Sequence, residues 1–324
     1  MINQFRNLNP VNLILLVVIA FVLRIGVLLQ LPDHLDFSLF EPYAGILIQL
    51  PEDLFSPFSN IFYSTVIILL QAMVLNRIVN SYNLLGKPSF LPALMYVTVS
   101  AMLEPFVVLN PVLIANFLIL WMIEKFFSIY RRESVLPVLF DLGMITALGT
   151  LIYFPFIGMM PLLWVSLVIF RPFNWREWVA GLVGFIAVVF FLCTIYYLTD
   201  SLGGFVNILP RVTRFRTGFH VNLYDYIVLI PVAVILILSV FTLQQKFYRS
   251  NVHVRKSYFI LIFLVLFTIV SFNITREYNI HHFLLAMPPL AILMAHFFTS
   301  STKRWFYESL YLILAAFIIY FQFV

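Results

Sequence analysis

Residues 177–198 read EWVAGLVGFIAVVFFLCTIYYL, and after Glu177 this stretch holds no charged side chain. An α-helix rises 1.5 Å per residue, so an apolar run of about 20 residues crosses the roughly 30 Å of hydrocarbon in a bilayer. Backbone amides find no water at that depth, and a helix satisfies them internally. The stretch therefore predicts a membrane-spanning helix.

Comparable apolar stretches recur along the whole chain. Of its 324 residues, 63% are hydrophobic and 10% are charged, whereas a soluble domain carries about 25% charged residues. No segment between apolar stretches exceeds about 30 residues, which is too short for a separate core. We expect an all-α polytopic transmembrane helix bundle in which residues 1–324 form a single domain. The predicted spans number about eleven, at approximately 11–30, 61–79, 90–109, 111–128, 135–152, 154–170, 177–198, 225–243, 257–274, 282–299 and 308–324.

The Lys and Arg residues are sorted to one side of these spans. Placing the N-terminus inside puts fourteen of the nineteen cations on the inner face, as the positive-inside rule predicts. We expect a bacterial inner membrane protein with a cytoplasmic N-terminus and a periplasmic C-terminus. The net charge of +5 then reflects topology and gives no indication of nucleic-acid binding. The exceptions to the sorting are five arginines, at positions 24, 211, 214, 216 and 276.

The first outer loop, residues 31–60, is rich in apolar and aromatic residues and predicts short helices lying on the membrane surface. Its first half contains Asp33, Asp36, Glu41 and Tyr43. One reading is a solvated loop that caps helices. The other is a carboxylate held at the bilayer edge as a general base, with Asp36 as the first candidate and Asp33 as the second.

Two more charged residues lie close to this loop in the predicted topology. Arg24 is near the outer end of the first span, where it either extends to the interface or faces the bundle and pairs with a loop acid. Glu104 lies in the short second outer loop, where it either caps a helix or serves as a second active-site acid.

The loop at 199–224 is basic and aromatic. Arg211, Arg214, Arg216 and His220 are interleaved with phenylalanines. Guanidinium groups bind phosphate oxygens bidentately. The segment therefore predicts either contact with anionic lipid or a specific pocket for a lipid-linked phosphate.

A last polar group precedes the span at 282–299. Arg276 and Tyr278 form a candidate pair for binding phosphate or sugar. His281 and His282 are adjacent and cannot both point the same way on a helix, so we do not predict a metal pair. No cofactor is expected, and nothing supports a divalent metal.

These stretches resemble the GT-C superfamily of polytopic glycosyltransferases, which take sugars from polyprenyl-phosphate carriers. The resemblance implies that Asp36 or Asp33 is the catalytic base and that Glu104 is a further acid. It also implies that Arg276, in TREYNIHHFLLAMPPLAILMA (275–295), contacts the carrier phosphate. The strict Asp-Asp or Asp-Glu pair of several member families is replaced here by DHLD and FEPY. The chain also resembles an integral membrane family common in Bacteroidetes.

The sequence thus predicts transfer of a polyprenyl-phosphate-linked sugar to a glycan, lipid or protein acceptor, with the lipid tail bound between apolar helices. A different class remains open, namely a non-enzymatic membrane subunit of an envelope or secretion complex. A transporter is a third reading, with Asp141 as the coupling residue. Because Asp141 lies close to the cytoplasmic end of its span, helix capping or pairing with Arg131 or Arg132 is the favoured explanation of this residue.

Overall fold

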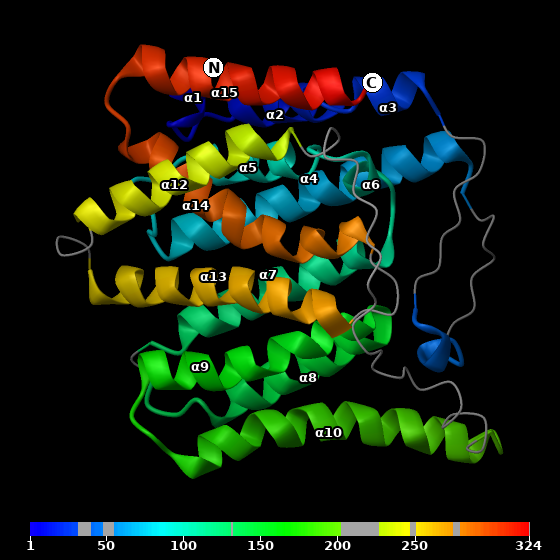
Figure 1. Cartoon of the computed structure of the whole chain (residues 1–324). Helices are drawn as coiled ribbons and strands as arrows, with labels where there is room; N and C mark the ends of the chain where they lie inside the picture. The colour runs from blue at the N-terminus through cyan, green and yellow to red at the C-terminus, as the bar shows by residue number, and fades with distance from the viewer. Residues whose placement is uncertain are drawn as a thin grey trace.

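A computed structural model describes residues 1–31, 40–47, 55–130, 132–201, 227–246, 251–274 and 279–323. Every regular element in these ranges is helical, which confirms the all-α fold. The longer helices lie side by side and run back and forth between two ends of a bundle (Figure 1). They are α2 (Val11–Val22), α4 (Pro57–Ser81), α5 (Leu91–Val99), α7 (Pro111–Ser128), α8 (Leu136–Ile152), α9 (Met160–Phe170), α10 (Trp175–Leu198), α12 (Leu229–Lys246), α13 (Val252–Ser271), α14 (Met287–Ser300) and α15 (Arg304–Phe321).

Shorter helical elements connect or extend these helices. The short α-helices are α1 (Ile2–Phe5), α3 (Ile25–Leu29) and α6 (Glu104–Val107). The 3-10 turns are η1 (Pro42–Ala44), η2 (Phe154–Met159), η5 (Phe272–Ile274) and η6 (Ile280–Ala286). Because η2 leads directly into α9 and η6 into α14, each pair acts as one longer helical segment.

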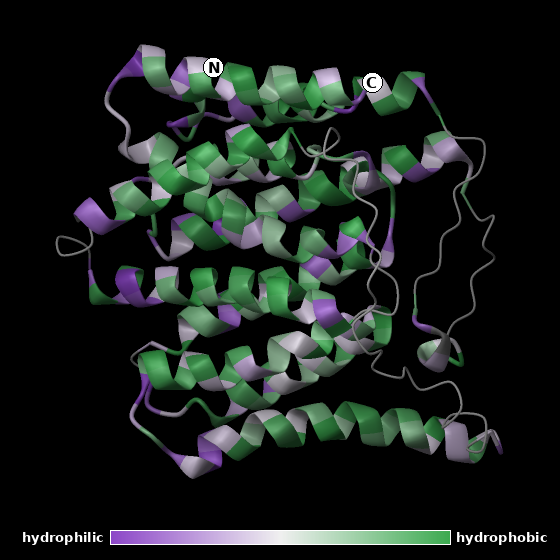
Figure 2. Ribbon diagram, in the orientation of Figure 1, coloured by the Kyte–Doolittle hydropathy of each residue, from purple (hydrophilic) through white to green (hydrophobic). Residues whose placement is uncertain are grey.

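Hydrophobic residues run along the helices and hydrophilic ones gather at their ends (Figure 2). Within the described ranges, six helical segments are long and apolar enough to cross a membrane. They are Pro57–Ser81, Pro111–Ser128, Trp175–Leu198, Val252–Ile274, Ile280–Ser300 and Arg304–Phe321, and four shorter apolar helices accompany them. The chain is therefore a multi-pass helical membrane protein.

Local sequence explains where two of these helices begin. Ser56 precedes Pro57, and its side chain accepts a hydrogen bond from the amide of Ser59 at 3.3 Å. Asn110 precedes Pro111 and accepts from the amide of Leu113 at 2.8 Å. A polar cap followed by proline satisfies a free amide and fixes the first helical turn. As a result, α4 starts four residues before the predicted span at 61–79.

The centre and the edge of the bundle differ in burial. All nine residues of α5 are buried. In the most apolar 18-residue stretch of Ile280–Ser300, 78% of the residues are buried, whereas the corresponding stretch of Trp175–Leu198 is 17% buried. Helix α10 packs on α8 through glycines: a Cβ at Gly184 would collide with the carbonyl oxygen of Phe140, and one at Gly143 with that of Gly181. The opposite flank of α10 is apolar and exposed, as expected for a helix that faces lipid.

Two of the predicted spans are broken helices. The first stops at Val22 and resumes at Ile25, and the third stops at Val99 before α6 starts at Glu104. The two breaks are joined by Gln322, at the end of α15, whose amide nitrogen donates to the carbonyls of Leu23 at 2.5 Å and Ala101 at 3.1 Å. Carbonyl groups freed by a break inside a membrane need such partners. The sequence did not predict these breaks.

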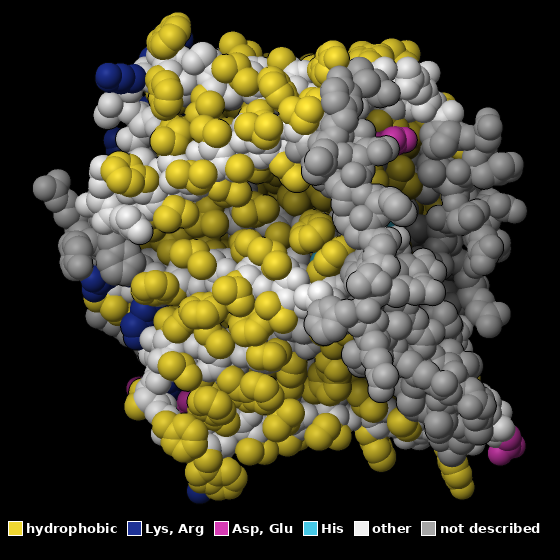
Figure 3. All heavy atoms as spheres, in the orientation of Figure 1, with side chains coloured by type: hydrophobic (Ala, Val, Ile, Leu, Met, Phe, Trp, Pro, Cys, Tyr) yellow, Lys and Arg dark blue, Asp and Glu magenta, His cyan; other side chains and the backbone are white. Residues whose placement is uncertain are grey.

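The two ends of the bundle carry different charges. One end, here called the basic end, comprises residues 1–10 and the connections 82–90, 129–130, 132–135, 171–174 and 301–303. The other, the opposite end, comprises residues 40–47, 100–110, 272–274 and 279–280 (Figure 1). Lys and Arg side chains gather along the left edge of Figure 3, which is the basic end. Of the cations with described side chains, Arg24 alone lies away from it.

Candidate functional site

The segment 40–47 is anchored to the opposite end of the bundle. An Oε1 atom of Glu41 accepts a hydrogen bond from the backbone amide of Phe154 at 2.9 Å. The amide of Glu41 itself donates to the carbonyl of Leu151 at 3.0 Å. These bonds occupy free backbone groups where α8 ends and η2 begins, so the carboxylate acts as a helix cap from a distant part of the chain.

Tyr43 strengthens this anchor. Its hydroxyl donates to the carbonyl of Thr150, and its own carbonyl accepts from the hydroxyl of Tyr196 on α10 at 2.6 Å. The Tyr43 ring meets Phe154 edge-on, with ring centroids 6.4 Å apart. Burial, and secondarily the nearby Glu41 carboxylate, raises the pKa of Tyr43 above its ordinary value. The phenol therefore remains a hydrogen-bond donor.

His282 lies buried on η6 and is bonded through both ring nitrogens. Its Nε2 lies 2.9 Å from the carbonyl oxygen of Thr268 and 3.2 Å from Oγ of Ser271. A carbonyl can only accept, so Nε2 carries a proton. In the neutral ring, Nδ1 then accepts from the hydroxyl of Tyr153, 3.0 Å away. His282 thus joins α13, η6 and the start of η2.

Tyr153 is the centre of this cluster. Burial raises the pKa of its hydroxyl, and the negative charge of Glu41 raises it further. Its ring centroid lies 5.6 Å from that of His282 and 6.3 Å from that of His281. Three residues predicted from the sequence, Glu41, His281 and His282, therefore lie near a tyrosine that the prediction missed. The fourth, Tyr43, is bonded nearby, to the carbonyl of Thr150. The sequence did contain a signal for Tyr153. It is a tyrosine at the end of an apolar span, and a buried tyrosine hydroxyl needs a hydrogen-bond partner.

Glu104 and Arg24 occupy different positions in the bundle. Glu104 is exposed in the first turn of α6, which packs against η6, so it belongs to the same end as the histidines. Arg24 is fully buried at the break between α2 and α3 and donates to the carbonyl of Ala20 at 2.8 Å and Oγ of Ser100 at 3.4 Å. It faces the bundle, and it forms no ion pair with any carboxylate in the described ranges.

The remaining predicted site residues lie outside the described residues. They are Asp33, Asp36, Arg211, Arg214, Arg216, His220, Arg276 and Tyr278. Of the predicted surface helices in 31–60, the described part contains the 3-10 turn η1 and the start of α4. Among the described residues, no three His, Cys, Asp or Glu side chains are grouped closely enough to hold a metal ion.

The structure shows an ion-pair partner of Asp141 that the sequence did not suggest. Asp141, in the second turn of α8, forms an ion pair of 2.6 Å with Lys125 in the last turn of α7. The sequence had suggested Arg131 or Arg132. Arg131 lies outside the described residues, and the packing of α7 on α8 brings Lys125 to Asp141. The pair gives this carboxylate a structural role in holding α7 to α8.

The fold and this site define a multi-pass helical membrane protein with a hydrogen-bonded polar cluster at one end of its bundle. The chain belongs to DUF6427, a family of unknown function, which matches residues 42–324. No curated protein and no solved structure matches the chain.

Proposed function

We propose that this protein is a glycosyltransferase that uses a polyprenyl-phosphate-linked sugar at the outer face of a bacterial inner membrane. In this proposal the chain crosses the membrane eleven times, with the N-terminus cytoplasmic and the C-terminus periplasmic. Six long apolar segments, the shorter apolar helices and the cations at the basic end support this arrangement. The opposite end, which holds Glu41, Glu104 and the two histidines, then faces the periplasm.

The observation that carries the proposal is the gathering of polar residues from three distant segments. The segment 40–47, the turn at Tyr153 and the η6 segment meet at the opposite end of the bundle. Polar groups are expensive inside a membrane bundle: burying one without a hydrogen-bond partner costs roughly several kcal/mol of free energy. Their presence at this position therefore favours a functional role. A substrate with a polar headgroup and an apolar tail fits an end of the bundle that lies at the bilayer surface.

The reaction assigns roles to residues in and beyond the cluster. A carboxylate, Asp36 first and Asp33 second, takes the proton from an acceptor hydroxyl. The acceptor oxygen then forms a bond to the anomeric carbon, and the bond from that carbon to the phosphate oxygen breaks. The electron pair stays on the phosphate, where Arg276, with help from Arg211, Arg214 or Arg216, stabilises the charge. Glu41 and Tyr43 act as positioning residues that anchor the first outer loop.

The direct test is an assay of sugar transfer by the purified protein in proteoliposomes. A panel of polyprenyl-phosphate sugars would serve as donors, and released polyprenyl phosphate would be measured. The proposal expects release by the wild-type protein and a loss of about 10²-fold or more in D36N. A Lys87→Gln variant, at the basic end, is the matched control and should keep full activity. Equal rates in the D36N, D33N and wild-type proteins would overturn the assignment of the base.

A second candidate function is a non-enzymatic membrane subunit. It is favoured by the completeness of the bonds described above, because Glu41, Tyr43 and His282 are all partnered within the bundle. A subunit of this kind would release no polyprenyl phosphate from any donor in the panel. It would also remain bound to a partner when the membrane is solubilised in mild detergent.

A further inference from the structure

An open groove of about 450 Å³ lies at the basic end, between the first turns of α8 and α10. Leu136 and Phe140 form its α8 wall, and Val179 and Val183 form its α10 wall. Small-molecule sites range from about 300 to 1,000 Å³ and are mainly apolar. The volume of the groove falls in this range and its lining is mainly apolar. It is far from the polar cluster around Tyr153 because it lies at the other end of α8.

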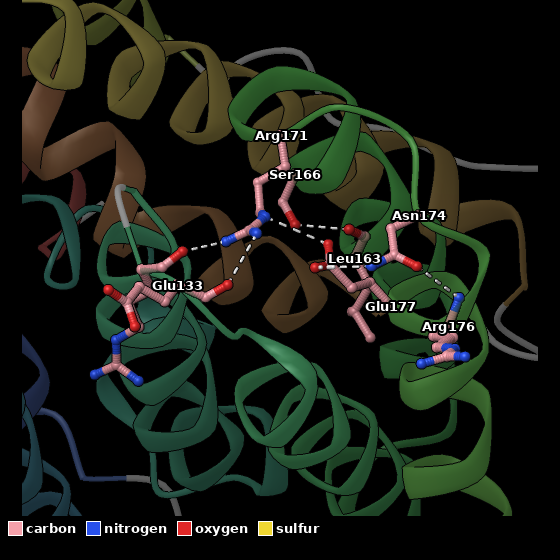
Figure 4. A network of polar contacts seen from close by, with 8 residues as sticks. Glu133, Leu163, Ser166, Arg171, Asn174, Arg176 and Glu177 are labelled. Atoms are coloured by element: carbon pink, nitrogen blue, oxygen red, sulfur yellow. Dashed lines mark hydrogen bonds and ion pairs between the residues drawn. The ribbon is translucent and has the colours of Figure 1, made fainter.

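The charges around the groove leave one cation unmatched. Asp141, which lines the groove, is neutralised by Lys125 at 2.6 Å. Arg171 is paired with Glu177 at 3.4 Å. The backbone amide of Arg176 donates to Oδ1 of Asn174 at 3.2 Å (Figure 4), but its exposed side chain forms no ion pair with any described residue. An apolar wall therefore lies beside a single free guanidinium group.

The neighbouring residue Trp175 also lines the groove and is 63% exposed. Its ring lies 5.9 Å from the guanidinium carbon of Arg176. Tryptophan side chains gather at the boundary between headgroups and acyl chains. Trp175 thus places the groove at the depth where a lipid headgroup meets its chains, and the exposed apolar flank of α10 leaves the groove open to the bilayer.

We propose that this groove binds an anionic phospholipid of the surrounding leaflet, with an acyl chain along the α8 and α10 walls and the phosphate on Arg176. A free inorganic anion would make no contact with the apolar walls, and a neutral hydrocarbon would form no ion pair with Arg176. Basic pockets between membrane helices bind anionic headgroups in this way. The proposal does not depend on sugar transfer, because it concerns the other end of the bundle.

Trp175 provides the probe for the test. A variant in which Trp121, Trp164, Trp178 and Trp305 are replaced by Phe would be reconstituted into nanodiscs. These would contain small fractions of phosphatidylglycerol or phosphatidylcholine brominated on the acyl chain, which quenches tryptophan on contact. We expect brominated phosphatidylglycerol to reach half-maximal quenching of Trp175 at a lipid fraction about fivefold lower than the fraction of brominated phosphatidylcholine that is needed. Adding Arg176→Gln should abolish this preference, and Val183→Phe, which fills the groove, should weaken quenching by both lipids.

The matched control retains Trp305 in place of Trp175, because Trp305 is also exposed at the basic end but does not line the groove. Because Lys303 and Arg304 precede Trp305, these cations also attract anionic lipid, but Arg176→Gln should leave any difference in the quenching of Trp305 by the two lipids unchanged. Equal quenching of Trp175 by both lipids would overturn the proposal, as would a preference that survives Arg176→Gln. Shielding of Trp175 from both lipids would indicate a protein partner in the groove and would also overturn it.

A second measurement uses the protein with all five tryptophans, in case the substituted chain fails to fold. The wild-type protein and Arg176→Gln would be purified in mild detergent, and retained lipid would be counted by native mass spectrometry. The proposal expects phosphatidylglycerol to remain bound to the wild-type protein and to be lost from the variant. Equal retention by both proteins would contradict it.

Discussion

At the scale of single residues, the cluster around Tyr153 shows how a membrane bundle partners its polar groups. His281 and His282 are neighbours in the sequence, yet their surroundings differ. The ring of His282 is buried and bonded on both nitrogens, whereas His281 is half-buried and lies against the edge of Tyr153. The sequence marked both histidines as polar residues before a late span. It could not reveal the partner Tyr153, which is 129 positions away.

The bond between Tyr153 and His282 can be measured in isolation by a double-mutant cycle. Tyr153→Phe, His282→Ala and the double variant would be unfolded thermally or with denaturant in detergent. We expect each single change to lower the free energy of unfolding by about 1–3 kcal/mol, because a buried group loses its partner. The coupling energy should be about 0.5–1.5 kcal/mol. Additive effects of the two single changes would show that the bond contributes nothing to stability.

At the scale of elements, the broken helices limit what hydropathy can predict. Both breaks are flanked by apolar residues, so the mean hydropathy of the sequence remains high across Leu23 and across Ala101. At both breaks the freed carbonyls find a distant partner, Gln322, which is 299 and 221 positions away from Leu23 and Ala101. The existence of several membrane-spanning helices could be predicted from composition, but the continuity of each helix could not.

Gln322 should therefore stabilise both breaks. Gln322→Ala would leave the carbonyls of Leu23 and Ala101 without this donor, and we expect a loss of about 1–3 kcal/mol in the free energy of unfolding. Gly26→Leu should cause a comparable loss, because a Cβ there would lie 2.5 Å from Cβ of Gln322. Thermal unfolding followed by circular dichroism would measure both. Wild-type stability in both variants would contradict this role for Gln322.

The packing of α10 on α8 depends on glycine. In Gly184→Leu the new side chain meets the backbone of Phe140 and should push α10 away. Cys193, the only cysteine in the sequence, lies half-buried on α10. Its rate of alkylation therefore measures whether α10 has moved away from α8. We expect alkylation by N-ethylmaleimide in membranes to become several-fold faster than in the wild-type protein. Ile186→Leu, at an exposed position of the same helix, is the control. An unchanged alkylation rate in Gly184→Leu would show that the close approach is not required.

At the scale of the whole molecule, the sorting of charge divides the bundle into a basic end and an end that carries the polar cluster. Composition alone predicted a polytopic helical fold, and charge alone predicted which connections share an end. The arrangement of the cluster could not be predicted, because it depends on contacts among segments 40–47, 150–154 and 280–286 that are distant in the sequence. Local patterns carry no information about such contacts.

The proposed orientation is tested with single cysteines in a Cys193→Ser background. Lys87→Cys marks the basic end and Thr199→Cys marks the end of α10 on the other side. In intact cells with a permeable outer membrane, an impermeant maleimide should label Thr199→Cys and leave Lys87→Cys unlabelled until the inner membrane is disrupted. The reverse pattern would place the polar cluster in the cytoplasm and remove the topological basis of the proposed reaction.

The central claim is that the opposite end binds a polyprenyl phosphate, and photo-crosslinking tests it most directly. A radiolabelled polyprenyl-phosphate analogue with a photoreactive group near the phosphate would be irradiated with the protein in proteoliposomes, and the labelled peptides would be mapped. We predict label on peptides containing residues 40–47 or 279–286, reduced by excess unlabelled polyprenyl phosphate and not by phosphatidylglycerol. Label confined to the groove between α8 and α10, or label that excess polyprenyl phosphate does not reduce, would contradict the claim.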